Sequence, residues 1–527
     1  MSTAAPDSSL PIAPSARRVV LIGMMFGASL AAIDQMVLAT AVGTIAGELG
    51  DLRQAPWIFT ANLLASASGM PIWGKLGDLY GRRRVFLSAI ALFIVASLLA
   101  AQSESMAWLI VCRALQGLGG GALLTMPYGI LADVVPARDR PAYIALVTAV
   151  WTVAGVVGPP LGGFIVEGPG WRWMFYMNLP GALTAFFLLR WAYRVPVERH
   201  DHEVDFAGAL LLFLSVGSFI LYTSWAGEAY GFSAPRALAL LAASFVFGGA
   251  FVWRERRAAE PIVPIALFRQ RAVWAPLLTT FLYGLSNFAL TFLIPLFGLV
   301  VRGTSAVEAG LGLMPLTFGL LFSSIVMGRL AASTARFRRY AMGGLCVYGA
   351  GLVLLAMAGP DASRLHLWGC TAILGLGSGP LNPVLIASLQ NAVDERHLGV
   401  ASSMPGFART VAQTMGSSAL GALLALRFAR HLEAEVRPLV GPGTALEGLA
   451  ESPEAIRALA QPVRSAVVAA YSAALSETFV AMVVLVGFAL VAAGFLIDPV
   501  RVAPPRGRTR AGGPSLRAQS GPARPER

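Results

Sequence analysis

The stretch GKLGDLYGRRR, residues 74–84, is a short polar loop between two apolar segments. Residues 57–73 and 85–101 on either side each approach the roughly 20 apolar residues that a helix needs to span a bilayer. Short cytoplasmic loops of membrane proteins retain Lys and Arg. The three consecutive arginines therefore predict that this loop lies on the cytoplasmic face of a membrane.

The composition indicates an integral membrane protein. Hydrophobic residues make up 56% of the 527 residues and charged residues only 13%, whereas a soluble globular domain carries about 25% charged residues. The net charge of +12 does not predict a nucleic-acid partner, because no basic, aromatic-interleaved region lies outside the apolar segments. We assign the basic excess to membrane topology.

The sequence lacks the residue patterns that are typical of an enzyme. It has no Ser/His/Asp set in a suitable context. Residues 69–75 follow the spacing of a phosphate loop, but Leu76 stands where that loop needs Ser or Thr. Cys112, Cys346 and Cys370 do not have the spacing of metal ligands. We therefore expect no enzymatic activity, no metal site and no cofactor.

Apolar runs predict fourteen membrane-spanning helices, each near the length that a bilayer requires. The first six cover residues 19–45, 56–73, 85–101, 107–132, 142–166 and 174–192. Two follow at 206–225 and 237–253, and six more at 274–301, 309–330, 341–358, 365–389, 400–426 and 475–497. The expected fold class is an all-α membrane protein.

The distribution of arginines orients these helices. With a cytoplasmic N-terminus, the stretches that face the cytoplasm before the tail carry twenty arginines, and the short loops on the other side carry five. Those five are Arg53, Arg172, Arg236, Arg302 and Arg364. Positive residues are retained inside, so we expect both termini on the cytoplasmic side of the inner (cytoplasmic) membrane.

The two halves of the chain carry a repeated pattern. Gly74 and the arginines after it have counterparts in Gly328 and the arginines at 336, 338 and 339, whereas Ala332 stands opposite Asp78. Two parallel six-helix repeats place a central site at their interface. The predicted regions are a cytoplasmic N-terminal segment at 1–18, a six-helix repeat at 19–193, two inserted helices at 205–254, a second six-helix repeat at 273–497 with an extracytoplasmic loop at 427–473, and a disordered cytoplasmic tail at 498–527.

Asp34 lies about fifteen residues into the first predicted span, near the middle of the bilayer. A buried charge in a membrane is costly, so this carboxyl must pair, bind a proton or face water. Burial favours its protonated form and an approaching cation favours its ionised form. We expect a proton switch that water and substrate reach in turn. The alternative is a solvated acid without a part in coupling.

Two arginines, Arg113 and Arg409, also lie inside predicted spans, and Gln116 follows Arg113 by one turn on the same helix face. Arg113 is the stronger candidate for a functional role, and a structural ion pair is the alternative for both arginines. The residues expected to line a substrate cavity are Gln35, Asn62, Gln116, Tyr128, Asn287, Phe288, Phe292, Asn382 and Arg409.

The fifth predicted span is rich in small residues and proline. It carries Gly155, Gly158, Pro159, Pro160, Gly162 and Gly163. Small residues spaced by four let helices approach closely, and a proline interrupts the helical hydrogen bonds. We expect a thin, kinked helix and a flexible contact between the repeats, with plain tight packing as the alternative.

These motifs together resemble a known family. GKLGDLYGRRR resembles the loop signature of the major facilitator superfamily, CRALQG at 112–117 resembles its fourth-helix motif, and residues 155–163 resemble the fifth-helix motif of its exporters. With fourteen spans, WRW at 171–173 and GLGLMP at 310–315, the chain resembles the EmrB/QacA-type drug:proton antiporters over residues 32–497.

The resemblance implies roles for several residues. In the family, the loop acid, here Asp78, steadies the outward-facing state by meeting a helix end of the other half, and Asp34 and Arg113 correspond to residues of proton coupling. The residues expected to act in conformational switching are Gly74, Asp78, Gly81, Arg82, Arg83, Gly155, Gly158, Pro159, Gly162 and Gly163. Departures at Gly43 and Asn62 leave the substrate range open.

We therefore expect proton-coupled efflux of hydrophobic or amphipathic drugs and toxic compounds by alternating access. The expected partners are small hydrophobic or cationic substrates, protons and membrane lipid, and whether a periplasmic adaptor joins the pump is left open. The main alternative is a dedicated exporter of one metabolite, fatty acid or natural product on the same scaffold. A membrane receptor or structural scaffold is a further alternative, which the buried Asp34 and Arg113 disfavour.

Overall fold

The computed structural model describes residues 13–38, 40–49, 54, 57–194, 205–225, 234–360, 362–440, 456 and 459–498, and every regular element among them is helical. Most of the predicted N-terminal segment, the tail from residue 499 and residues 441–455 and 457–458 of the predicted 427–473 loop lie outside the described residues.

Helices occupy all the ranges where the sequence predicts spans. The first half contains α1 (Pro14–Leu38), α2 (Val42–Leu49), α3 (Trp57–Tyr80), α4 (Arg82–Ala101), α5 (Met106–Val134), α6 (Arg140–Glu167), α7 (Trp173–Tyr176) and α8 (Asn178–Ala192). The inserted pair is α9 (Phe206–Trp225) and α10 (Pro235–Glu255), followed by the short η3 (Ile265–Arg269). The second half contains α11 (Arg271–Asn287), α12 (Leu290–Leu296), η4 (Phe297–Val301), α13 (Ala306–Leu311), α14 (Met314–Thr334), α15 (Phe337–Ala356), α16 (Arg364–Ser378), α17 (Leu381–Gln390), η5 (Glu395–His397), α18 (Leu398–His431), η6 (Leu432–Val436), α19 (Arg437–Val440) and α21 (Val463–Gly494).

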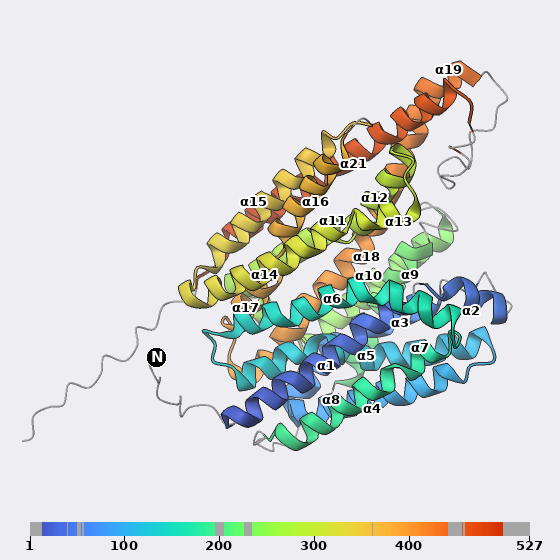
Figure 1. Cartoon of the computed structure of the whole chain (residues 1–527). Coiled ribbons are helices and arrows are strands. Elements are labelled where there is room, and N and C mark those ends of the chain that lie inside the picture. Colours follow the sequence, from blue (N-terminus) through green and yellow to red (C-terminus); the bar gives the residue numbers. More distant parts are fainter. Residues whose placement is uncertain are drawn as a thin grey trace, which may run out of the picture.

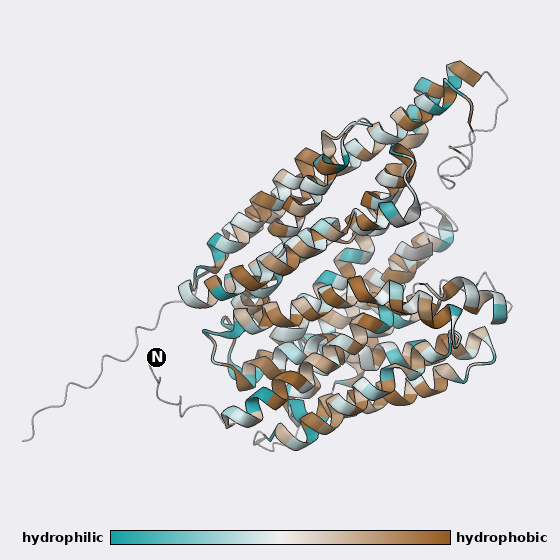
Figure 2. Cartoon of the chain, viewed as in Figure 1, coloured by the Kyte–Doolittle hydropathy of each residue, from teal (hydrophilic) through white to brown (hydrophobic). Residues whose placement is uncertain are grey.

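Within the described residues, eleven helical segments are long and apolar enough to cross a membrane. Figure 2 shows apolar residues along the length of the helices and polar residues concentrated near their ends. The predicted spans at α3, α8 and α18 do not reach the same apolar length, since α8 has only 15 residues and the other two carry many polar and small side chains. The chain is a multi-pass membrane protein, and the count of fourteen crossings stays a prediction.

The helices form two bundles that meet along two seams (Figure 1). At one seam α3 of the first half packs on α18 of the second, and at the other α14 of the second half packs on α6 of the first. Since α3 and α14 carry the repeated glycine pattern, the pairing is reciprocal, as two parallel repeats require. We call the end of the molecule that carries Gly81 and the first turns of α6 and α18 the arginine-rich face, and the other end the opposite face.

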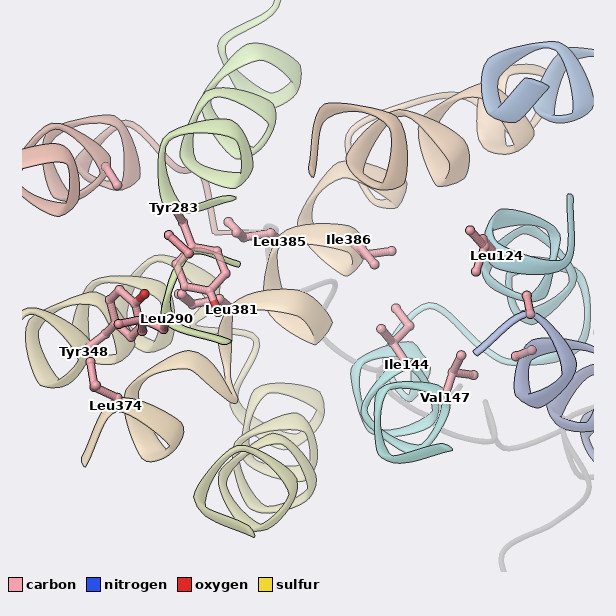
Figure 3. Close-up of a cluster of buried hydrophobic side chains, with 14 of the residues drawn as sticks. Leu124, Ile144, Val147, Tyr283, Leu290, Tyr348, Leu374, Leu381, Leu385 and Ile386 are labelled. Atoms are coloured by element: carbon pink, nitrogen blue, oxygen red, sulfur yellow. The ribbon is translucent and has the colours of Figure 1, made fainter. Parts of the chain in front are cut away.

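One buried apolar cluster extends through both halves. Figure 3 shows Tyr283 against Tyr348, and their rings meet edge to face with centroids 5.3 Å apart. In the same view Ile386 of α17 points toward Ile144 and Val147 of α6. The contact between α17 and α6 is therefore apolar at this level and excludes water.

The inserted pair covers the seam between α3 and α18. α9 packs on α10 and also contacts both α3 and α18. Its residues Leu212, Val216 and Ile220 form a small buried cluster with Ala67 of α3. After α10, Glu260 forms an ion pair with Lys75 at the end of α3, with 3.4 Å between Oε2 and Nζ. The two inserted helices, α9 and α10, are thus attached to the first half near the arginine-rich face.

α18 and α21 extend past neighbouring helices at the opposite face, where α19 lies (Figure 1). A helix of 34 residues is about 51 Å long, well beyond the roughly 30 Å of hydrocarbon. In this extension Phe428 and Tyr471 pack edge to face. His431 has its Nδ1 2.9 Å from Glu435 and its Nε2 3.1 Å from Glu477, and hydrogen bonds to these two carboxylates raise the pKa of His431.

Replacement of Gly416 tests the close approach of α18 to α11. A Cβ at Gly416 would lie 1.8 Å from the carbonyl oxygen of Leu285, so Gly416→Ala must push the two helices apart. We expect a lower melting temperature in detergent, measured by intrinsic tryptophan fluorescence. The control is Gly421→Ala on the same helix, where a Cβ meets nothing within 4 Å. Equal melting temperatures for the two variants would contradict this packing.

The raised pKa of His431 predicts a stability that depends on pH. Because the pKa is higher in the folded than in the unfolded chain, the imidazolium stabilises the extension below about pH 6.5 and this contribution is lost as the pH rises through the folded pKa. His431→Gln should therefore lower the melting temperature more at pH 5.5 than at pH 8.5. His366→Gln, which changes an exposed histidine, is the control. The same loss at both pH values would rule out this linkage.

Candidate functional site

A buried ion pair joins α1, α5 and α8 inside the first half. The Arg113 guanidinium donates from Nη1 to Oδ2 of Asp34 at 2.7 Å. The other carboxylate oxygen, Oδ1, accepts from Gln116 Nε2 at 2.9 Å and from Asn178 Nδ2 at 2.8 Å. Arg113 is fully buried and only 6% of Asp34 is exposed. The carboxylate is thus held by three donors, one of them charged, in an environment that excludes water.

The sequence leaves three states open for Asp34: paired with a cation, protonated or facing water. In this conformation Asp34 is paired, with Arg113. The expectation that water and substrate reach the carboxylate directly is not met here, because Asp34 faces the interior of its own bundle. The adjacent residue, Gln35, does line a cavity. The two side chains therefore face different environments from one turn of α1, so a movement of this helix affects both.

A cavity of about 500 Å³ lies between the halves, within the range of sites for drug-sized molecules. It is lined by α18, by single residues of α1, α3 and α9, and by Phe288, which directly follows α11. The lining residues are Gln35, Leu63, Thr223, Phe288, Thr410, Gln413, Thr414, Ser417, Ser418, Gly421, Ala422 and Ala425. Because α18 begins at the arginine-rich face, these residues place the cavity toward the opposite face.

Of the residues that the sequence predicts at a substrate cavity, Gln35 and Phe288 line this cavity. Asn62 is buried and donates to the backbone of Arg113, and Gln116 belongs to the Asp34 network. The other expected residues lie elsewhere: Tyr128 is buried beside Gln390, Asn287 is half-buried at the end of α11, Phe292 packs against the apolar cluster, and Asn382 and Arg409 lie together at the contact between α17 and α18.

The polar wall of the cavity on α18 was not expected from the sequence. Thr410, Gln413, Thr414, Ser417 and Ser418 are spaced by three and four residues, which puts them on one face of a helix. This amphipathic spacing inside a predicted span was the available signal. Thr223 had no such signal, because α9 belongs to the inserted pair and reaches the cavity only through tertiary packing.

A second polar site closes the arginine-rich face between the halves. The Asp78 carboxylate accepts from the backbone N–H of Gly399 at 2.8 and 2.9 Å and from that of Val400 at 3.1 Å. Those N–H groups belong to the first turn of α18, where they lack intrahelical partners and carry the positive end of the helix dipole. Arg82 donates to Asp78 at 2.7 Å and also binds Asp133. Asp78 thus links the first half to α18 of the second.

Glycines permit this close approach. A Cβ at Gly74 would lie 2.5 Å from Ser403 Oγ and 2.6 Å from the carbonyl oxygen of Gly399. Gly81 has a φ of 86°, which other residues rarely adopt. Arg83 donates to the carbonyl oxygen of Arg190, so this arginine contacts α8 rather than the second half.

The repeated pattern forms the corresponding contact at the other seam without a carboxylate. A Cβ at Gly328 of α14 would lie 2.8 Å from the carbonyl oxygen of Pro141, in the first turn of α6. Ala332 takes the position of Asp78, and Pro141 has no N–H to offer. The α6–α14 seam therefore has close packing but no charged link of this kind.

The glycines of α6 contact α1 in the same half, which corrects the expectation of a flexible contact between the repeats. A Cβ at Gly158 would lie 2.4 Å from Met36 Cβ, and one at Gly162 would lie 2.6 Å from the carbonyl oxygen of Val37. A Cβ at Gly155 or Gly163 would meet nothing within 4 Å. Pro159 lies within the helix. α6 is one continuous helix from Arg140 to Glu167, and the kink stays a prediction.

Comparison with known proteins places the chain in one family. The family described as Major Facilitator Superfamily matches residues 24–417. Multidrug resistance protein 3 of Bacillus subtilis (strain 168) is 33% identical over 416 residues, which cover 79% of this chain and 81% of that protein. Multidrug transporter protein MdtP of the same organism is 31% identical over 424 residues, covering 80% of this chain and 78% of that protein.

A solved structure supports the same fold. The proton:xylose symporter XylE of the major facilitator superfamily superposes with a TM-score of 0.55, covering 89% of this chain and 95% of that one. The sequence identity is 13%, so this likeness concerns the arrangement of helices alone.

Replacement of Asp78 tests the link between the halves. Asp78→Asn removes the charge that holds the first turn of α18, and a charged hydrogen bond contributes about 1.5–3 kcal/mol. We expect faster hydrogen–deuterium exchange of peptides that cover residues 398–403, by roughly tenfold or more. Asp394→Asn, an exposed carboxylate paired with Arg396, is the control. Unchanged exchange in Asp78→Asn would show that the carboxylate does not close this face.

The burial of the Asp34–Arg113 pair predicts a stability pattern. Asp34→Asn leaves a buried cation without its anion, which costs about 3–5 kcal/mol. The melting temperature should fall, and the double variant with Arg113→Gln should recover part of the loss because no charge is then buried. Glu308→Gln, at an exposed ion pair with Arg364, should have little effect. A double variant no more stable than Asp34→Asn would contradict this account.

Proposed function

The chain belongs to the major facilitator superfamily, and from this membership we propose that it exports hydrophobic or amphipathic compounds in exchange for protons. The cycle is alternating access of one central cavity across the cytoplasmic membrane, with the arginine-rich face and both termini inside. It needs no cofactor, because the proton gradient supplies the energy.

The observation that carries the proposal is the buried Asp34–Arg113 pair next to the cavity. Asp34 and the cavity residue Gln35 are consecutive on α1, and the same helix packs on α6 through Gly158 and Gly162. A proton on Asp34 removes the anion that Arg113 binds, so the bonds between α1, α5 and α8 weaken together. The resulting shift of α1 reaches the cavity at Gln35.

Asp78 would govern the other part of the cycle. Its contact with the first turn of α18 closes the arginine-rich face, while the cavity lies toward the opposite face. This conformation corresponds to an outward-facing state in which substrate leaves and a proton enters. Return to the inward-facing state then requires that the Asp78 contact opens.

The proton gradient is large enough for this task. One proton that crosses a potential of roughly 150 mV supplies about 3.5 kcal/mol. That energy sustains a gradient of a neutral substrate of roughly a few hundredfold.

The test is transport in inverted vesicles or proteoliposomes. Asp34→Asn should still bind substrate but should not accumulate it when a proton gradient is imposed, because the side chain no longer exchanges a proton. Glu308→Gln is the control and should transport normally. Full gradient-driven accumulation by Asp34→Asn would refute the assignment.

A counterflow panel separates the two kinds of exporter on this scaffold. A multidrug pump exchanges many structurally unrelated compounds, whereas an exporter dedicated to one metabolite exchanges a single class. Absence of any exchange would instead favour a receptor or scaffold.

A further inference from the structure

Arg409 is a cation inside a predicted span, at the interface of the two halves. It lies on α18, is half-buried, and its Nη1 donates to Asn382 Oδ1 of α17 at 3.4 Å. Asn382 Nδ2 in turn donates to Thr148 Oγ1 of α6 at 2.9 Å. Because this chain of contacts runs from the second half to the first, the guanidinium lies between the halves and does not face lipid.

No described carboxylate forms an ion pair with Arg409. A guanidinium has five N–H donors, and the described residues provide Arg409 with one long hydrogen bond to a neutral amide. By contrast, the other intramembrane arginine, Arg113, is matched by Asp34. A cation in the membrane interior without a counter-ion is costly to retain. The interface therefore carries one positive charge that the described protein does not balance.

The position of Arg409 relates this charge to the cavity. Gln413, which lines the cavity, lies one helical turn after Arg409 on the same face of α18. Thr410, the next residue, also lines it. Arg409 itself does not line the cavity: it lies one turn before Gln413, on the side of the lining residues nearer the arginine-rich face, and its guanidinium contacts Asn382 of α17.

We propose that Arg409 recognises an anionic group and that the exported substrates are amphipathic compounds bearing a carboxylate. The carboxylate binds the guanidinium fork through two parallel hydrogen bonds. The apolar body lies in the cavity against Leu63, Phe288 and Ala422. A cationic substrate meets like charge, so cationic compounds, which were expected among the substrates, are disfavoured. This inference rests on the proposed export function.

The test uses three probes that share one apolar body and differ in charge. These are pyrenebutyrate, pyrenebutanol and a pyrenebutyl trimethylammonium salt, titrated by fluorescence into the full chain in neutral detergent at pH 7.5. We expect the carboxylate to bind roughly tenfold tighter than the alcohol, since charged hydrogen bonds are formed. The ammonium probe should bind more weakly than the alcohol.

Two variants test whether Arg409 causes the preference for the carboxylate probe. Arg409→Gln should bind all three probes with similar affinity, and Arg409→Lys should retain part of the preference because the charge remains without the fork. Arg339→Gln, an exposed arginine at the arginine-rich face, should behave as the wild type. If Arg409→Gln does not fold, the probe series on the wild type and Arg409→Lys decide the question.

Equal binding of the carboxylate and the alcohol by the wild type, no binding of the carboxylate, or an unchanged preference in Arg409→Gln would each overturn the proposal. The export function is measured separately, as uptake of the neutral alcohol into inverted vesicles under a proton gradient. Gradient-driven transport of the alcohol without a carboxylate preference would leave the pump in place and remove only the role of Arg409.

Discussion

The buried ion pair between Asp34 and Arg113 is the constraint around which the first half is arranged. Two opposite charges are stable inside a membrane protein only when they neutralise each other and when hydrogen bonds satisfy the remaining atoms. Gln116 and Asn178 donate hydrogen bonds to the second oxygen of the Asp34 carboxylate, so the ion pair and its partners join α1, α5 and α8. In the proposed cycle, a proton on the carboxylate would remove this balance and weaken the contacts among the three helices together.

The link at the arginine-rich face makes the two seams unequal. Asp78 binds the first turn of α18 in one seam, whereas the equivalent position in the other is Ala332 and the first turn of the facing helix contains Pro141. α9 also covers only the α3–α18 seam among the described residues. The α3–α18 seam therefore has a charged contact and is covered by α9, whereas the α6–α14 seam depends on close packing.

The sequence predicted the helical fold and a multi-pass membrane protein well, because long apolar runs are local signals. The orientation drawn from the arginine asymmetry stays a prediction. It also singled out Asp34 and Arg113, since charged side chains inside spans are conspicuous, and the structure joins these two residues in an ion pair. Gln116, which was expected at the cavity, belongs to this buried network instead. It predicted the partner of the α6 glycines less well, because spacing shows that two helices touch but not which two. Thr223 illustrates the same limit: its place at the cavity follows from how α9 packs across α3 and α18, and no local pattern encodes that contact.

The most direct test of proton coupling is the pH dependence of substrate binding, measured at equilibrium in detergent with a neutral substrate. If substrate and proton exclude each other, the wild-type affinity falls as the pH falls, by up to about tenfold per pH unit, and Asp34→Asn binds with the same affinity throughout. An affinity of the wild type that does not change with pH, with normal gradient-driven transport, would contradict the account.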